Sequence, residues 1–174
     1  MPSKFAIPAG ILGLAAFVAF GWFMTDDQSA VQTSPKAEWK SFDEGLSLAR
    51  QEGKMVVVDV YTDWCTWCKK MDSETYADHL VSQELRSHFI VVKLNAESSD
   101  LVTFNGERMT SAQFAQAAGV TGYPTTLFLD EQQKPISVVP GYAPPEKFVD
   151  ILRYFGEDHY KTTQFQDYLN KRGG

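Results

Sequence analysis

Positive charge is scarce in this sequence. Its 174 residues include 16 lysines and arginines against 22 aspartates and glutamates, a formal net charge of −6 at pH 7, and the isoelectric point is near 5.0. No basic cluster is longer than two residues, as in the pair Lys69-Lys70. Because a protein that binds nucleic acid presents clustered lysines and arginines on one face, the composition argues against nucleic acid as a partner.

Cysteine and histidine are also scarce, which limits the metal sites that the chain can build. The two cysteines, Cys65 and Cys68, lie in the stretch VDVYTDWCTWCKKMD, and the only histidines are His79, His88 and His159. A structural zinc site needs four ligands, and none of these histidines lies at ligand spacing from the cysteines. A c-type haem needs a histidine directly after the second cysteine, where this sequence has a lysine. We therefore expect neither a metal nor a bound cofactor.

Internal repeats and low-complexity segments are absent, and one long uncharged segment stands out. Residues 5–24, FAIPAGILGLAAFVAFGWFM, are apolar without one charge, and about 20 such residues are what a bilayer core requires. Lys4 precedes the segment, and Asp26 and Asp27 follow it. Positive charge favours the cytoplasmic side, so we expect residues 1–24 to be a single-helix membrane anchor with everything after it outside the cytoplasm.

A cleaved signal peptide is the alternative for this segment. The apolar run is longer than a usual signal-peptide core, and the best cleavage motif, Gln28-Ser29-Ala30, is poor because of its glutamine. In either case the remainder is exported, to the periplasmic side in a bacterium, where two cysteines can oxidise. Residues 25–37 are polar, small and unpatterned, and we expect a linker there.

Several segments have apolar residues at helical spacing. Helices are predicted over residues 38–52, 73–89, 110–118 and 145–155, with a further one over 158–169. Gly53 should end the first helix, and Ser73 or Asp72 should cap the second. Leu80, Val81 and Leu85 are expected to share the buried side of that second helix.

Extended patterns alternate with the helical ones. β-branched apolar runs at residues 55–61 and 89–97 predict strands that are buried on both faces. Residues 125–130 and 135–141 flank the turn EQQK and predict a hairpin, whereas 98–108 are polar and are expected to be a loop. Together these elements predict an α/β layer fold, in which a mixed sheet carries helices on both faces.

The Cys-x-x-Cys motif is then a structural disulfide or a reactive dithiol. A structural disulfide stabilises by closing a long loop, and a two-residue gap closes almost none. Cys65 comes where a buried strand passes into a helix, so its sulfur should face N–H groups that stabilise a thiolate. Cys65 is then the attacking thiol, and Cys68, one turn later and more buried, resolves the mixed disulfide. Lys69 would add positive potential nearby.

Two other sites look placed for the same chemistry. Asp59 lies inside the apolar run MVVVDVY, where it should be protonated or share its charge; Lys93 is the obvious partner, and such an acid can accept the proton of the resolving thiol. Both side chains could instead point outward.

The segment GYPTT contains the second of these sites. A cis Tyr123–Pro124 bond would present a backbone edge of Tyr123, Pro124 and Thr125 to a substrate strand. An ordinary turn proline is the alternative.

These motifs occur in a familiar order: an aspartate six residues before the first cysteine, YTDWCTWCKKM, VVKLN, GYPTT and the glycine of VVPGY. In this the chain resembles the thioredoxin superfamily over residues 38–156, which leaves 157–174 as a C-terminal helical extension. The segment WCKKMDSETYADHLVSQELRSHFIVVKLN is similar to an exported subgroup that includes the C-terminal periplasmic domain of the bacterial transmembrane reductase DsbD.

The resemblance implies a thioredoxin fold and a role for each matching residue. It implies Cys65 as the nucleophile, Cys68 as the resolving thiol of a redox disulfide, Asp59 as the proton acceptor beside Lys93, and Trp64 as a lid over the disulfide. Pro124 would be the cis-proline. The implied activity is a membrane-anchored extracytoplasmic thiol–disulfide oxidoreductase, a reductase of protein disulfides that a membrane electron-transfer partner recycles.

Two departures keep alternatives open. Thr66-Trp67 replaces the Gly-Pro of common thioredoxins, so the direction of electron flow, reductase or oxidase and isomerase, does not carry over. Residues 95–119 are longer than in a minimal thioredoxin, either as a tolerated insertion or as a partner-recognition segment. The rival functions are a chaperone-like assembly module without turnover and a copper-delivery protein that would bring His79 or His88 to Cys65.

Overall fold

The computed structural model describes residues 36–172, which belong to one compact unit, Thr33–Gly174. The predicted membrane anchor, residues 1–24, lies outside the described residues, as does nearly all of the predicted linker. Among residues 36–172, no helix is long and apolar enough to cross a membrane.

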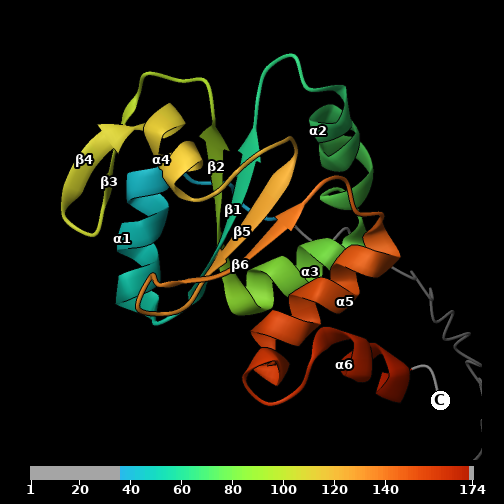
Figure 1. Ribbon diagram of the computed structural model, residues 1–174. Coiled ribbons are helices and arrows are strands. Elements are labelled where there is room, and N and C mark those ends of the chain that lie inside the picture. Colours follow the sequence, from blue (N-terminus) through green and yellow to red (C-terminus); the bar gives the residue numbers. More distant parts are fainter. Residues whose placement is uncertain (1–35, 173–174) are drawn as a thin grey trace, which may run out of the picture. The chain divides into compact units, whose positions relative to one another are not determined.

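A four-stranded mixed sheet with the order β2-β1-β5-β6 forms the centre of the fold (Figure 1). Strand β1 (Met55–Tyr61) runs parallel to β2 (Phe89–Asn95) and antiparallel to β5 (Thr125–Leu129), and β6 (Pro135–Pro140) is antiparallel to β5. Strands β1 and β2 are buried almost throughout, as their β-branched apolar sequences predict. The predicted strands and hairpin are therefore confirmed.

Helices cover both faces of this sheet, which confirms the predicted fold class (Figure 1). Helices α1 (Phe42–Glu52) and α4 (Ser111–Ala117) pack on one face, and α3 (His79–His88) and α5 (Pro145–Gly156) on the other. Side chains alternate along a strand, so Val56, Val58 and Val60 face the first pair of helices, whereas Val57 faces the second. By the same alternation, Asp59 faces the side of α3 and α5.

The chain after the cysteines differs from the prediction. Helix α2 (Thr66–Lys70) continues into a π-helical turn, Met71–Thr75, and α3 begins only at His79. The predicted cap at Ser73 or Asp72 is wrong, because those residues still belong to the preceding helical turn. Instead, Asp78 caps α3: its Oδ1 accepts hydrogen bonds from the N–H groups of Leu80 (2.9 Å) and Val81 (3.1 Å).

The predicted buried side of α3 is also only partly correct. Val81 and Leu85 are completely buried, but Leu80 is 49% exposed. Because α3 begins at His79, Leu80 lies in its first turn and points to solvent while its neighbour Val81 enters the core.

Residues 98–108, predicted to be a loop, instead form most of a hairpin. Strands β3 (Leu101–Phe104) and β4 (Glu107–Thr110) pair around Asn105-Gly106, whose φ angles of 53° and 83° are left-handed, as a two-residue hairpin turn requires. The ring of Phe104 lies 5.1 Å from that of Phe114 in α4. The segment between β2 and α4 is therefore an ordered part of one helical layer.

The remaining elements complete the edges and the C-terminus. The backbone of Lys40 bridges to β2: its N–H donates to the Val91 carbonyl (2.9 Å), and the N–H of Lys93 donates to its carbonyl (3.1 Å). This bridge is why α1 begins at Phe42 rather than at residue 38. After α5, a 3₁₀ turn (His159–Lys161) leads to α6 (Phe165–Arg172), whose Tyr168 is buried in the core.

Candidate active site

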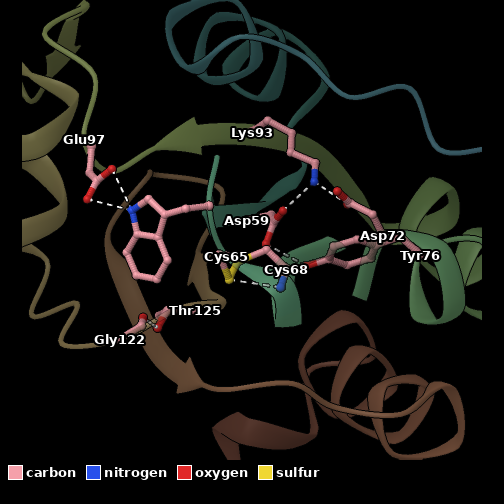
Figure 2. Close-up of a disulfide and its surroundings, with 10 residues drawn as sticks. Asp59, Cys65, Cys68, Asp72, Tyr76, Lys93, Glu97, Gly122 and Thr125 are labelled. Atoms are coloured by element: carbon pink, nitrogen blue, oxygen red, sulfur yellow. Dashed lines mark hydrogen bonds and ion pairs between the residues drawn. A yellow bond between two sulfur atoms is a disulfide. The ribbon is translucent and has the colours of Figure 1, made fainter. Parts of the chain in front are cut away.

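The two cysteines lie where β1 passes into α2, and they form a disulfide (Figure 2). Their Cα atoms are 5.3 Å apart. Cys65 is the N-cap of α2, and its Sγ accepts a hydrogen bond of 3.0 Å from the backbone N–H of Cys68. The two residues are 4% and 3% exposed, so the predicted difference in burial is small. An N–H group aimed at the Cys65 sulfur would stabilise its thiolate after reduction.

Asp59 is buried beside the disulfide, and its carboxyl group interacts with two other side chains (Figure 2). Strand register places Lys93 opposite Asp59, and Lys93 Nζ lies 2.7 Å from Asp59 Oδ2. The hydroxyl of Tyr76 donates a hydrogen bond of 3.1 Å to the other carboxylate oxygen, Oδ1. The alternative in which Asp59 and Lys93 point outward is therefore wrong.

Burial and charge act in opposite directions on this group. Burial raises the pKa of Asp59 above its usual value, although the Lys93 ammonium and the Tyr76 hydroxyl oppose this shift. Burial disfavours the charged form of Lys93, but the carboxylates of Asp59 and Asp72 outweigh it, so its pKa is raised. Burial and the adjacent Asp59 raise the pKa of Tyr76 well above its usual value, which keeps its hydroxyl a donor. Asp59 is thus a buried carboxyl group with a perturbed pKa, a property that is common among residues of functional sites.

The segment before β5 has the backbone geometry that the sequence predicts. The Tyr123–Pro124 bond is cis. The Pro124 carbonyl accepts a hydrogen bond of 2.8 Å from the N–H of Gly141, and Thr125 Oγ1 donates one of 2.7 Å to the Gly122 carbonyl. Within residues 36–172, the Tyr123 backbone makes no hydrogen bond, so its N–H and C=O remain available to another chain.

Two exposed tryptophans adjoin the cysteines in the sequence. Trp64 is 64% exposed, and its Nε1 donates to both carboxylate oxygens of Glu97 at 3.0 Å. Its ring lies 6.0 Å from that of Tyr123. Trp67 is 56% exposed, and its ring lies 5.5 Å from that of Tyr142. These aromatic pairs provide apolar contact area next to the disulfide, while the lid role of Trp64 stays a prediction.

Lys69 is exposed and, among the described residues, forms no ion pair. Its neighbour Lys70 instead pairs with Glu74 at 2.9 Å. The structure therefore gives Lys69 no defined contact through which it would act on the sulfur atoms.

The histidines that a copper site would need are not brought to the cysteines. His88 directly precedes β2, whose first residue pairs with Met55 at the start of β1, whereas the cysteines follow the other end of β1. A seven-residue strand spans roughly 20 Å. His88 instead lies near Glu84 and Glu157, with ligand atoms within 4.8 Å of one another, and Glu84 is already paired with Arg153. Among residues 36–172, the exposed His79 forms no group of potential metal ligands with the two cysteines.

Several residues of the site were not identified from the sequence. Asp72 belongs to the π-helical turn after α2, Tyr76 directly follows that turn, and Glu97 follows β2. The contacts of Asp72 and Tyr76 depend on where that turn directs the chain, which no local periodicity indicates. The aromatic Trp39, predicted only to be part of a helix, lies against the Lys93 side chain.

Comparison with known proteins relates the chain to one domain family. The family model described as a thioredoxin-like domain matches residues 42–156. The thiol:disulfide interchange protein DsbD of Vibrio vulnificus is 32% identical over 134 residues, 73% of this chain and 21% of that protein. The DsbD of Tatumella citrea is 35% identical over 108 residues, 61% of this chain and 17% of that protein. The chain thus spans about a fifth of the length of these curated relatives.

Solved structures show the same fold. A thioredoxin-fold protein from Helicobacter pylori has a TM-score of 0.59 at 22% identity, covering 70% of this chain and 80% of that one. A thioredoxin from Thermus thermophilus has a TM-score of 0.57 at 24% identity, covering 75% of this chain and 100% of that one.

Proposed function

The chain belongs to the thioredoxin-like domain family, and on this premise we propose that it is a thiol–disulfide oxidoreductase that acts on protein disulfides through Cys65 and Cys68. The observation that carries the proposal is the Cys65–Cys68 disulfide, which lies next to the buried Asp59 and its ion pair with Lys93. A disulfide with a purely structural role would not need an ionisable group in the core beside it.

The first step is attack on the substrate. A substrate strand pairs with the free backbone groups of Tyr123, beside Pro124, by β-augmentation. The Cys65 thiolate attacks one sulfur of the substrate disulfide, whose S–S bond breaks. The other substrate sulfur leaves as a thiolate, and Cys65 is left in a mixed disulfide. The Cys68 N–H, which donates to Cys65 Sγ, favours the thiolate that this step needs.

The second step releases the substrate. Cys68 transfers its proton to the Asp59 carboxylate, and the resulting thiolate attacks Cys65 Sγ. The mixed S–S bond breaks, the substrate sulfur leaves as a thiolate, and the Cys65–Cys68 disulfide forms. Two electrons have then passed from the protein to the substrate. Burial makes Asp59 a stronger base than an exposed aspartate, which suits it to accept this proton.

We propose that the chain works as a reductase outside the cytoplasm, anchored by residues 1–24 and linked by 25–37. The relatives of this domain are named thiol:disulfide interchange proteins, which agrees with a protein that passes electrons between dithiols. A reductase must be reduced again after each cycle, so the proposal includes a membrane electron-transfer partner as well as protein disulfide substrates.

The proposal is tested by trapping the intermediate. In Cys68→Ser the second step is blocked, so Cys65 should accumulate in mixed disulfides that appear on non-reducing gels and disappear with a reductant. Cys65→Ser, the matched control, should trap nothing. If Cys68→Ser traps no partner and leaves function intact, the chain is an assembly module without turnover.

The direction of electron flow is tested by the reduction potential of the pair, titrated against glutathione. A value of roughly −270 mV, like that of thioredoxin, would support the reductase. A value of roughly −120 mV, like that of DsbA, would make the protein an oxidant and contradict this part of the proposal.

A further inference from the structure

The ammonium group of Lys93 is surrounded by aromatic rings as well as carboxylates. Its Nζ lies 5.0 Å from the ring centroid of Trp39, 5.3 Å from that of Tyr61 and 5.4 Å from that of Tyr76. All three distances fall within the range of a cation–π contact. The rings come from three places in the chain: the segment before α1, the end of β1 and the residue after the π-helical turn. We call these three residues the aromatic cage.

The cage restricts a side chain that would otherwise move. The Lys93 side chain is 24% exposed, so its ammonium has a route to solvent, and a lysine has many rotamers to occupy there. The rings of Trp39 and Tyr76 also contact each other edge to face, with centroids 4.7 Å apart. The two rings therefore pack together against the Lys93 ammonium and restrict it to the side on which Asp59 lies.

Tyr76 contacts both members of the buried ion pair. Its ring faces the Lys93 ammonium, while its hydroxyl donates to Asp59 Oδ1. This leaves Asp59 Oδ2 for Lys93. Both carboxylate oxygens thus have fixed partners, and the orientation of the carboxyl group relative to the disulfide depends on Tyr76.

We propose that Trp39 and Tyr76 are positioning residues for the redox reaction: they hold the Lys93 ammonium and the Asp59 carboxylate in contact, and thereby set the pH range in which Asp59 can take the proton of Cys68. The inference rests on the proposed function. The titratable groups that face Asp59 are Lys93 from β2, and Asp72 and Tyr76 from the turn after α2, with Cys68 of α2 as the proton donor.

The contacts of Asp59 with Tyr76 and Lys93 determine the direction in which its pKa shifts when one of them is lost. The Tyr76 hydroxyl and the Lys93 ammonium both stabilise the ionised form of Asp59, so the loss of either contact raises the pKa of Asp59 further. The acid limb of the pH–rate profile then moves to higher pH. A shift of about 0.5 pH unit corresponds to a rate about threefold lower on that limb, because each unit is tenfold.

Two variants separate the contributions of ring and hydroxyl. Tyr76→Phe keeps the ring and removes only the hydroxyl, whereas Trp39→Leu removes one ring of the cage. The matched controls are Tyr154→Phe, whose hydroxyl donates to the distant Thr163 carbonyl, and Phe104→Leu, which removes a ring from the opposite face of the sheet. Each protein is reduced, and its oxidation by glutathione disulfide is followed from pH 5 to 9. Carbon-13 NMR of the Asp59 carboxyl in the oxidised protein gives its titration directly.

We expect the Asp59 titration and the acid limb to move up by roughly 0.5 pH unit or more in Tyr76→Phe and in Trp39→Leu, and to stay in place in both controls. If wild type exchanges disulfides but the two variants titrate as it does, the cage proposal is overturned and the proposed function stands. If wild type does not exchange at any pH, the proposed function fails, and this inference fails with it. Should Trp39→Leu not fold, Tyr76→Phe decides alone.

Discussion

Asp59 is an ionisable group in a strand whose other side chains are almost all apolar and buried, and its effect on stability depends on pH. Because its pKa is raised in the folded protein, the folded state holds this proton more tightly than the unfolded chain does. From about pH 4, where an unfolded aspartate ionises, up to the raised folded pKa, the unfolded chain binds fewer protons. The contribution of Asp59 to the free energy of unfolding therefore falls as the pH rises through this window.

Asp59→Asn should remove the decrease in the free energy of unfolding that the ionisation of Asp59 causes as the pH rises. We expect the free energy of unfolding of the variant, minus that of wild type, to increase with pH through the window, at about 1.4 kcal/mol for each unit of pKa difference. Denaturant unfolding of the oxidised proteins between pH 4 and 8 measures it, with the exposed Asp63→Asn as control. Parallel stability curves for Asp59→Asn and wild type would contradict the raised pKa.

The pairing of Asp59 with Lys93 follows from sequence reasoning, and the cage does not. A carboxylate inside an apolar strand requires a partner, and Lys93 is the one basic residue within the next buried strand. Trp39 and Tyr76 reach Lys93 only because Lys40 bridges to β2 and because a π-helical turn extends α2. Neither of these features has a sequence pattern that periodicity can detect.

Helix α1 packs closely on β2 at one residue. A Cβ atom built at Gly45 would collide with Cγ2 of Val92, a completely buried and β-branched side chain that has little room to move. An alanine in an exposed helical position usually stabilises relative to glycine, by about 1 kcal/mol. Here the collision should reverse that sign.

We expect Gly45→Ala to lower the free energy of unfolding by roughly 1–3 kcal/mol, the usual cost of overpacking a core. Ser47→Ala in the same helix is the control and should change stability little. A double-mutant cycle with Val92→Ala, measured by denaturant unfolding, should show the two substitutions partly compensating. If Gly45→Ala is as stable as wild type, α1 does not approach β2 this closely.

The elements that sequence reasoning missed are those in which two sequence patterns favour different structures. The hairpin of β3 and β4 contains Asn105-Gly106 between short alternating runs, a strong hairpin signal, but the polarity of residues 98–108 favours a loop. Likewise, Asp72 and Ser73 look like caps in isolation, yet the chain continues its helical turn through Thr75. By contrast, β1 and β2 were predicted correctly, because burial on both faces leaves little room for another pattern.

For the chain as a whole, the main open prediction is its attachment to the membrane. If residues 1–24 are a retained anchor, the full chain expressed in bacterial cells should sediment with the membranes and resist extraction by carbonate. After reduction, Cys65 should react with a maleimide that cannot cross the inner membrane. A soluble periplasmic product of lower mass would instead indicate a cleaved signal peptide, and a cytoplasmic product would contradict export.

Both outer strands of the central sheet are restricted in how they can meet another chain. Lys40 occupies part of the outer side of β2, and β6 begins and ends with a proline, a residue that cannot donate to a neighbouring strand. Unprotected sheet edges are where proteins polymerise into aggregates. A protein that must offer backbone to foreign, partly unfolded chains is exposed to that danger. Here the free backbone groups of Tyr123 adjoin the cis-proline. In our proposal a foreign strand therefore pairs with this chain only beside the cysteines, where the encounter ends in disulfide exchange and release of the substrate and not in aggregation.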